Sequence, residues 1–224
     1  QSRGASEKFH GAVIDHYGVS DTRVFREVAK VGVALEKLQE VNGSQNPAEA
    51  AVIYDVENRW AVEDAAGPRN AGVFYKETVE KPYQAFRKLG INVDLIDETR
   101  SLDGYRVVAA PMVYLLREGW TEKVRNFVKN GGNFLLTYWS GIVDETDLCY
   151  LGGTPHDLMD VMGFRSMEID GLYDGEWNEG IPEPENPLHL ELAYRCSHLC
   201  ELVQPSTAEV VMTYGKDFYD GMPA

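Results

Sequence analysis

The run Ala51-Val-Ile-Tyr-Asp55 decides the fold, because it has the composition of a buried parallel strand. Four residues that suit a strand precede an aspartate, and Val-Glu-Asn-Arg-Trp60 follows it. Strands of a parallel sheet are covered on both faces and are therefore nearly continuous apolar runs. Ligands of such sheets lie just past the carboxyl ends of the strands. The segment from Asp55 to Trp60 is therefore the first candidate site.

Downstream of this run the sequence alternates between strand and helix patterns. We expect strands at 51–55, 92–96, 107–110 and 133–138, and helices at 76–89 and 121–129. Gly90 stands where a helix can end in a left-handed residue. Repeated strand–helix units of this length predict an α/β fold with a doubly wound parallel sheet and right-handed crossovers.

The regular pattern fades after residue 140. A short helix is expected over 155–162 and a last strand over 209–214. From Glu168 to Glu185 the chain carries seven acidic residues and no Lys or Arg, together with three glycines and two prolines. This composition predicts a long surface loop.

An amphipathic helix is expected before the sheet. Asp21 can serve as its N-cap, and the apolar stripe comprises Val24, Val28, Val31, Leu35 and Leu38. Asn42-Gly-Ser-Gln-Asn-Pro47 is polar and rich in helix breakers, which is typical of a linker. The stripe needs a covering partner and nothing before it supplies one. We therefore expect the chain to be a fragment of a longer protein.

Composition excludes several classes of partner. The chain has 21 Lys and Arg against 36 Asp and Glu, a net charge of −15, which argues against nucleic acid and anionic membranes. Three cysteines without a framework spacing favour a reducing compartment, so a cytoplasmic location is expected. No apolar run is long enough for a membrane span. No cofactor motif stands out.

The polar residues offer two candidate binding sites. Glu7 and His10 are three residues apart and can face one side of a short helix, where a carboxylate and an imidazole could bind the hydroxyl groups of a sugar. A surface pair is the simpler interpretation of this spacing. At the first strand end, Asp55 and Glu57 would repel a phosphate, so we expect capping and local ion pairs there, with Trp60 packed.

Two further constellations argue against chemistry in this chain. Ser140 follows a predicted strand, but the nucleophile elbow of hydrolases needs a small residue two positions earlier, where Tyr138 stands. Cys196, His198 and Cys200 alternate and would share one side of a strand, yet they lack the two-residue gap of zinc-binding cysteines. We therefore predict neither a catalytic residue nor a metal site.

Four segments of the sequence resemble one family of enzymes. Ser2-Arg-Gly-Ala-Ser-Glu-Lys-Phe-His-Gly-Ala12 resembles the segment that closes the catalytic barrel of glycoside hydrolase family 42 β-galactosidases. The middle domain of that family is similar to three segments: Val52-Ile-Tyr-Asp-Val-Glu-Asn-Arg-Trp60, Gly132-Asn-Phe-Leu-Leu-Thr-Tyr-Trp-Ser-Gly-Ile-Val-Asp-Glu145 and Leu148-Cys-Tyr-Leu-Gly-Gly153.

The resemblance implies a division of labour in the parent enzyme. Residues 1–41 would be the end of a (β/α)8 barrel, with its last helix at 20–41, and residues 47–224 a trimerisation domain, truncated at its C-terminus if the fragment ends early. The family retains anomeric configuration with two glutamates about 5 Å apart. Both would precede residue 1. Glu7 and His10 would match the Glu-x-x-His that contacts galactose hydroxyls.

The expected function is therefore a non-catalytic trimerisation domain of a retaining β-galactosidase. Its partners would be two further copies of itself and, in the intact enzyme, a galactoside. The fold implied is flavodoxin-like or similar to class I glutamine amidotransferases. The alternative is a free-standing amidotransferase-like or flavodoxin-like enzyme that uses the strand ends.

Overall fold

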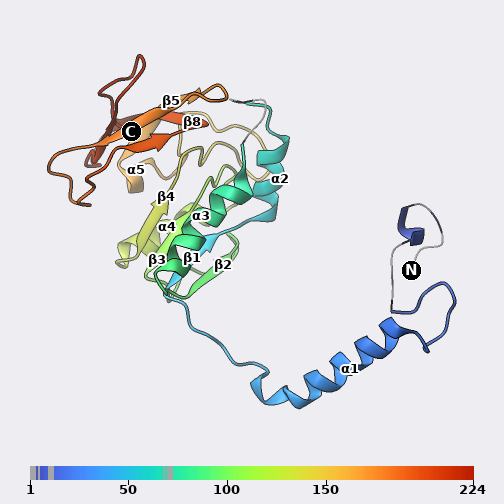
Figure 1. Ribbon diagram of the computed structural model, residues 1–224. Helices are drawn as coiled ribbons and strands as arrows, with labels where there is room; N and C mark the ends of the chain where they lie inside the picture. The colour runs from blue at the N-terminus through green and yellow to red at the C-terminus, as the bar shows by residue number, and fades with distance from the viewer. Residues whose placement is uncertain (1–3, 5, 10–12, 68, 70–72) are drawn as a thin grey trace. The chain divides into compact units, whose positions relative to one another are not determined.

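The computed structural model describes residues 4, 6–9, 13–67, 69 and 73–224 of the chain (Figure 1). It divides into two units, Gln1–Asn46 and Pro47–Ala224. Within the described residues no helix is long and apolar enough to cross a membrane.

The unit Gln1–Asn46 is built around one amphipathic helix. It contains the 3-10 turn η1 (Ser6–Phe9), helix α1 (Arg23–Lys37) and the 3-10 turn η2 (Gln39–Val41). Thr22 caps α1 by accepting the backbone N–H of Phe25 at 3.1 Å. The predicted cap, Asp21, instead pairs with Arg26, because a threonine one residue later fits the cap equally well. All five side chains of the predicted stripe are exposed, by 39 to 63%.

A four-stranded parallel sheet forms the centre of the unit Pro47–Ala224, which confirms the predicted α/β class (Figure 1). The spatial order is β2-β1-β3-β4. The strands are β1 (Ala50–Ile53), β2 (Val93–Ile96), β3 (Val107–Ala110) and β4 (Asn133–Leu136). Each overlaps the strand that its apolar run predicted. Strands β3 and β4 correspond to the third and fourth predicted strands.

Helices cover both faces of this sheet. Val52 of β1 packs in one apolar cluster with Val79 of α3 (Tyr75–Lys88). Its neighbour Ile53 packs in a second cluster with Val124 of α4 (Trp120–Lys129). Successive strand residues thus serve opposite layers, as alternation along a strand requires. Gly90 follows α3 with φ +73°, the left-handed conformation predicted for it.

Two helices differ from the sequence prediction. The segment after β1, which was not among the expected helices, is helix α2 (Val56–Asp64). Its Trp60, expected to be packed, is 61% exposed. Only Asn58, Ala61 and Val62 of α2 are buried, so its sequence shows no apolar period that could reveal it. Helix α5 (Met159–Met162) is shorter than the predicted 155–162.

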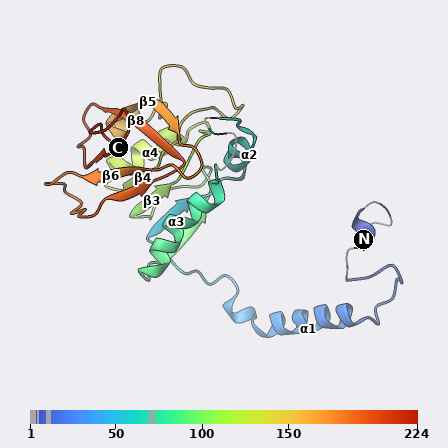
Figure 2. The same cartoon turned by 45° about the horizontal axis from the view of Figure 1, so that its top comes forward.

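The C-terminal part is antiparallel and more regular than expected. Strands β5 (Phe164–Gly171) and β8 (Leu199–Pro205) pair, and β6 (Asn178–Pro182) pairs with β7 (Tyr194–Cys196) and β9 (Met212–Tyr214). The prediction of a loop from Glu168 to Glu185 is therefore wrong for 168–171 and for β6, whereas 172–177 and 183–185 lie outside the strands. Antiparallel sheets can leave one face in water, so acidic side chains do not prevent strand formation there. Figure 2 shows these strands beside the parallel sheet.

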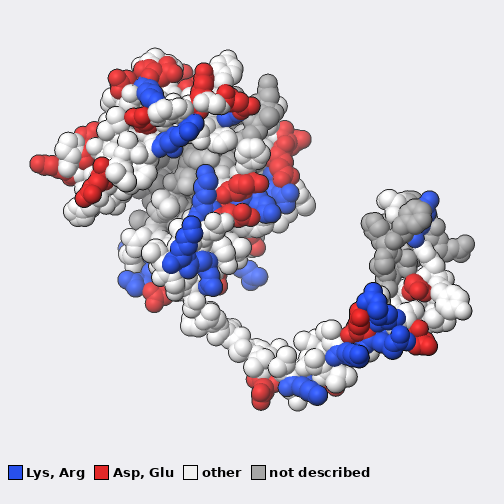
Figure 3. Space-filling view, viewed as in Figure 1, with Lys and Arg blue, Asp and Glu red and all other residues white. Residues whose placement is uncertain are grey.

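Charge is unevenly distributed on this unit. On the face seen in Figure 3, Asp and Glu gather over the C-terminal strands, whereas Lys and Arg line α3. Helix α3 contributes Lys76, Lys81, Arg87 and Lys88. The predicted acidic excursion is thus the solvated surface of folded strands.

Candidate functional site

The sugar-binding candidates lie at the limit of the described structure. Glu7 falls in the turn η1, but its side chain is outside the described part of the molecule. His10 lies outside the described residues altogether. Their proximity to each other is therefore still a prediction.

Asp55 occupies the other candidate site, at the carboxyl end of β1, and its carboxylate is fully engaged. Oδ1 accepts the backbone N–H groups of Glu57 and Asn58 at 2.9 and 3.1 Å, which makes Asp55 the N-cap of α2. Arg117 donates Nε to Oδ2 at 2.8 Å and Nη2 to Oδ1 at 2.9 Å. Burial raises the pKa of Asp55, but the hydrogen bonds from Arg117 and the backbone outweigh it and hold the pKa below its ordinary value.

The neighbouring Asn58 ties α2 to the loop after β3. Its Nδ2 donates to the backbone oxygen of Met112 at 2.9 Å, and its Oδ1 accepts the backbone N–H of Leu115 at 2.8 Å. Met112 has φ +46°, so the turn that Asn58 holds is a strained one. The hydroxyl of Tyr75 accepts the backbone N–H of Asp55 at 3.0 Å. Protein groups thus fill the place where related sheets bind ligands.

Glu98 lies beside this network and was not singled out by the sequence. It follows β2, is 1% exposed, and accepts the backbone N–H of Arg117 through Oε2 at 3.0 Å. Burial raises the pKa of its carboxyl to about 8, and the charge of Asp55 adds to the effect, whereas Arg117 and Lys123 oppose it. Its position two residues after a predicted strand was the available signal.

Asp55 and Glu98 have pKa values displaced in opposite directions, a pattern found in catalytic carboxyl pairs. Here the ionised member is fully buried and held by a bidentate arginine, so a substrate could not reach it without breaking the ion pair. A hollow of about 350 Å³ lies outside Glu98 and Arg117, with Glu118 and Glu145 at its wall. The carboxyl edge is therefore a structural network and not a prepared active site.

A residue with left-handed backbone follows β4, but it is not Ser140. Trp139, and not Ser140, has the left-handed backbone, with φ +54°, and its side chain is buried. Ser140 Oγ donates to the backbone oxygen of Thr137 at 2.9 Å and accepts the backbone N–H of Val113 at 3.1 Å. His156 stacks on Tyr150 with ring centroids 3.8 Å apart. The Ser140 hydroxyl is thus engaged with the backbone.

Cys196, His198 and Cys200 do not lie on one strand. Cys196 ends β7 and Cys200 lies in β8, while His198 between them has φ +79°. Cys196 and Cys200 pack in one apolar cluster, and burial raises the pKa of both thiols. Among the described residues no cluster of His, Cys, Asp and Glu could hold a metal ion.

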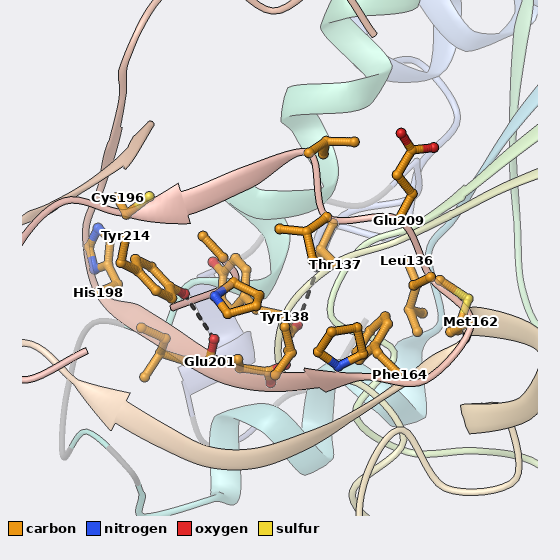
Figure 4. A pocket seen from close by; sticks show the side chains of 18 of the residues that line it. Leu136, Thr137, Tyr138, Met162, Phe164, Cys196, His198, Glu201, Glu209 and Tyr214 are labelled. Carbon is orange, nitrogen blue, oxygen red and sulfur yellow. Dashed lines mark hydrogen bonds between the residues drawn. The ribbon is translucent and has the colours of Figure 1, made fainter. Parts of the chain in front are cut away.

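A cavity of about 540 Å³ lies between the end of β4 and the C-terminal strands (Figure 4). Its wall includes Leu136, Tyr138 and Glu201. Glu201 Oε1 accepts the backbone N–H of Trp139 at 2.6 Å, and burial raises the pKa of its carboxyl to about 7. Tyr214 donates its hydroxyl to the backbone oxygen of Glu201 at 3.0 Å. Nothing in the sequence indicated this cavity, because its walls come from distant segments.

Comparison with known proteins identifies the relatives of both units. Residues 48–224 match a family model described as the β-galactosidase trimerisation domain, and residues 1–38 match one described as β-galactosidase. The whole chain is 52% identical to β-galactosidase BglY of Alicyclobacillus acidocaldarius and 50% identical to β-galactosidase Pbg of Clostridium perfringens. It covers 33% and 32% of these proteins, so it spans about a third of the length of the curated relatives it matches.

Solved structures agree with these sequence matches. The cold-adapted β-galactosidase from Rahnella sp. R3 is 50% identical with a TM-score of 0.80, and that from Bacillus circulans sp. alkalophilus is 44% identical with a TM-score of 0.79. Each comparison covers 100% of this chain and 33% of the solved one.

Proposed function

The chain belongs to glycoside hydrolase family 42, as a β-galactosidase trimerisation domain with a segment of the preceding domain, and we propose that it assembles three copies of its parent enzyme without catalysing a reaction itself. The family match over residues 48–224 carries this proposal. The engaged polar groups at the carboxyl edge support its second half, because Asp55 and Ser140 have no free functional group for a substrate.

The parent protein is proposed to hydrolyse terminal β-D-galactosides with retention of configuration. The relatives with the highest identities given above are named β-galactosidases. Retention requires a nucleophile and an acid/base, both carboxyl groups, in the part of the parent that forms the barrel. Glu7 and His10 are proposed to bind hydroxyl groups of the galactose ring, since a carboxylate and an imidazole together accept and donate hydrogen bonds.

The architecture of the parent is proposed on the same basis. Residues 1–41 would close a (β/α)8 barrel, and the exposed stripe of α1 would pack against that barrel. Residues 47–224 would form a flavodoxin-like trimerisation domain, for which the order β2-β1-β3-β4 is supporting evidence. A cytoplasmic location fits the free cysteines of the chain.

A free-standing amidotransferase-like or flavodoxin-like enzyme is not favoured. Its strand-end site would need an open carboxyl edge, and that edge is filled by Asp55, Asn58 and Arg117. Its nucleophile would need the left-handed position after β4, and that position holds the buried Trp139.

The assembly proposal is tested by the native mass and the activity of the purified 224-residue chain. We expect a species of three times the 25.1 kDa chain mass in sedimentation velocity, and no turnover of a nitrophenyl β-galactoside. A monomer at every concentration would show that residues 47–224 do not suffice for assembly. Galactoside turnover would refute the non-catalytic role independently.

The sugar-binding proposal is tested in the full-length parent. We expect His10→Ala to lower kcat/KM for galactosides much more than it lowers Tm, because the substrate loses a hydrogen-bond partner and the fold does not. His189→Ala, at an exposed position, is the control. An unchanged kcat/KM in His10→Ala would reject the assignment.

A further inference from the structure

The two edge strands of the parallel sheet differ in composition. Strand β2 carries Asp94, which accepts the hydroxyl of Tyr105 at 2.8 Å, so its edge holds a charge. Strand β4 has no charged residue and continues into Thr-Tyr-Trp139. Proteins protect genuine edge strands with charges, prolines or bulges, because a bare apolar edge recruits other strands. The composition of β4 is that of an internal strand.

One face of β4 is also uncovered. On the α4 side, Phe134 packs edge-on against Trp120 with ring centroids 6.5 Å apart. On the α3 side, Leu135 is 53% exposed although it stands level with Ala109, which is buried in the neighbouring strand. Internal strands of parallel sheets are covered on both faces. Strand β4 has such cover on one face only in the described structure.

The cavity of about 540 Å³ lies at the carboxyl end of β4. Leu136, Thr137 and Tyr138 form one wall, and Lys81 of α3 contributes to another. The opposite wall includes Val203 of β8 and Val211. Figure 4 shows Leu136 and Tyr138 around this space together with Glu201 and Tyr214 of the C-terminal strands. The cavity is a recess within one unit, and its lining combines apolar side chains with charged ones such as Lys81 and Glu201.

We propose that β4 is an internal strand of a larger sheet, and that its open edge and the adjoining cavity receive a further parallel strand and a helix from the same polypeptide. The order β2-β1-β3-β4 is the beginning of a doubly wound order in which a fifth strand pairs with the fourth. The occupant would come from the two thirds of its relatives' length that this chain does not span. A second copy is a poorer occupant, because a recess between α3, β4 and β8 is less accessible than a protruding edge.

The backbone geometry identifies the groups that the added strand must meet. Asn133 donates its backbone N–H to Arg106 beside β3 at 3.0 Å. Because hydrogen-bond directions alternate along a strand, the N–H groups of Phe134 and Leu136 point to the open edge. The carbonyl groups of the added strand would accept them. Its apolar side chains and those of the helix would cover Leu135.

Hydrogen exchange tests this pairing in the 224-residue chain and in the full-length parent. We expect the amides of Phe134 and Leu136 to exchange at least about tenfold more slowly in the parent, at all protein concentrations. Equal rates in the two proteins would overturn the proposal. Protection that appears in the short chain only as its concentration rises would identify a second copy as the occupant, and would also overturn it.

A matched pair of substitutions tests the covered face. Leu95 of β2 is 54% exposed and stands level with Val52, so it is the counterpart of Leu135 at the other edge. In the full-length parent we expect Leu135→Lys to lower Tm by about 4 °C or more and Leu95→Lys to change it little. In the short chain both should be tolerated. Equal tolerance in the parent would refute the proposal, and a native mass on the same samples separates this result from a failure to trimerise.

Discussion

Strand β1 and helix α1 carry equally clear apolar patterns, and the fold treats them in opposite ways. Every residue of Ala50–Ile53 is fully buried, whereas no residue of Arg23–Lys37 is buried. The period of an apolar pattern predicts the type of element and the face that is meant for burial. Whether the face is buried depends on other segments, which are present for β1 within this chain. The stripe of α1 is exposed in this chain, and its packing in the parent protein is part of the proposal above.

The ion pairs of the two regions differ in the same way. Asp55 at the end of β1 is 1% exposed and pairs with an arginine 62 residues away. On α1, Arg23 and Glu27 pair across one turn with side chains that are 73% and 57% exposed. Water screens the second pair and solvates both ions if it breaks. Because Asp55 is buried, water neither screens its ion pair nor solvates its carboxylate if the pair breaks.

The largest expected effect is the loss of the arginine at the buried pair. We expect Arg117→Met to lower the free energy of unfolding by about 3–5 kcal/mol, because it leaves the Asp55 carboxylate buried without a counter-ion. Urea denaturation measures the effect. Arg23→Met, on α1, is the matched control and should change stability little. Similar losses in both variants would show that burial does not set the strength of these pairs.

A smaller difference is expected for apolar truncations. Ile53→Ala in β1 should cost about 2–5 kcal/mol, since it leaves a cavity between the sheet and α4. Leu35→Ala in α1 should leave the unfolding transition of the 224-residue chain unchanged, because Leu35 is 63% exposed. The same pair of variants in the full-length parent sharpens the comparison. There, Leu35→Ala should also destabilise, and its failure to do so would show that the stripe stays exposed.

The smallest expected effect is a pH dependence of stability. Burial raises the pKa of Glu98 to about 8 and that of Glu201 to about 7, from 4.5. Each carboxyl keeps its proton in the folded state over a range in which the unfolded chain has lost it. The resulting stabilisation is complete below about pH 4.5 and is lost as pH rises through the folded pKa values.

Melting temperatures between pH 5 and 8 check this expectation. Between about pH 7 and 8 Glu98 keeps more of its proton than Glu201 does, so Glu98→Gln should reduce the fall of Tm in that interval. Glutamine keeps an oxygen for the backbone N–H of Arg117. Glu63→Gln, at an exposed position on α2, is the control. An unchanged slope in Glu98→Gln would contradict the raised pKa.

The sequence predicts the parallel sheet well, because each of its strands is a short apolar run. Strand β3 begins and ends at the predicted residues, Val107 and Ala110. Helix α2 escapes prediction since few of its residues are buried and they form no clear period. The strands after residue 164 escape for another reason. Their acidic residues favoured the prediction of a loop, although an antiparallel strand can carry acidic side chains on its solvated face.

The polar network is predictable only in part. Asp55 could be located from its position at the end of an apolar run, and its role as a cap follows from its residue type. Arg117 and Glu98 could not be paired with it, because nothing local in a sequence specifies a contact across 62 residues. Glu201 and the cavity beside it depend in the same way on how the C-terminal strands fold back. Contacts between distant segments, and not local patterns, decide whether a carboxyl group is free to bind a ligand or is engaged in holding the fold.

The backbone at Trp139 shows how a left-handed turn after a strand is held in place. Hydrolases present a nucleophile on a strained turn of this kind. Here the residue with φ +54° is a tryptophan whose indole is buried. Its backbone N–H donates a hydrogen bond to Glu201. The strained turn is therefore held by packing of the indole and by this hydrogen bond. The hydrogen bond to Glu201 involves only the backbone N–H of residue 139, whereas the packing depends on the indole, so the two contributions to this turn are chemically separate.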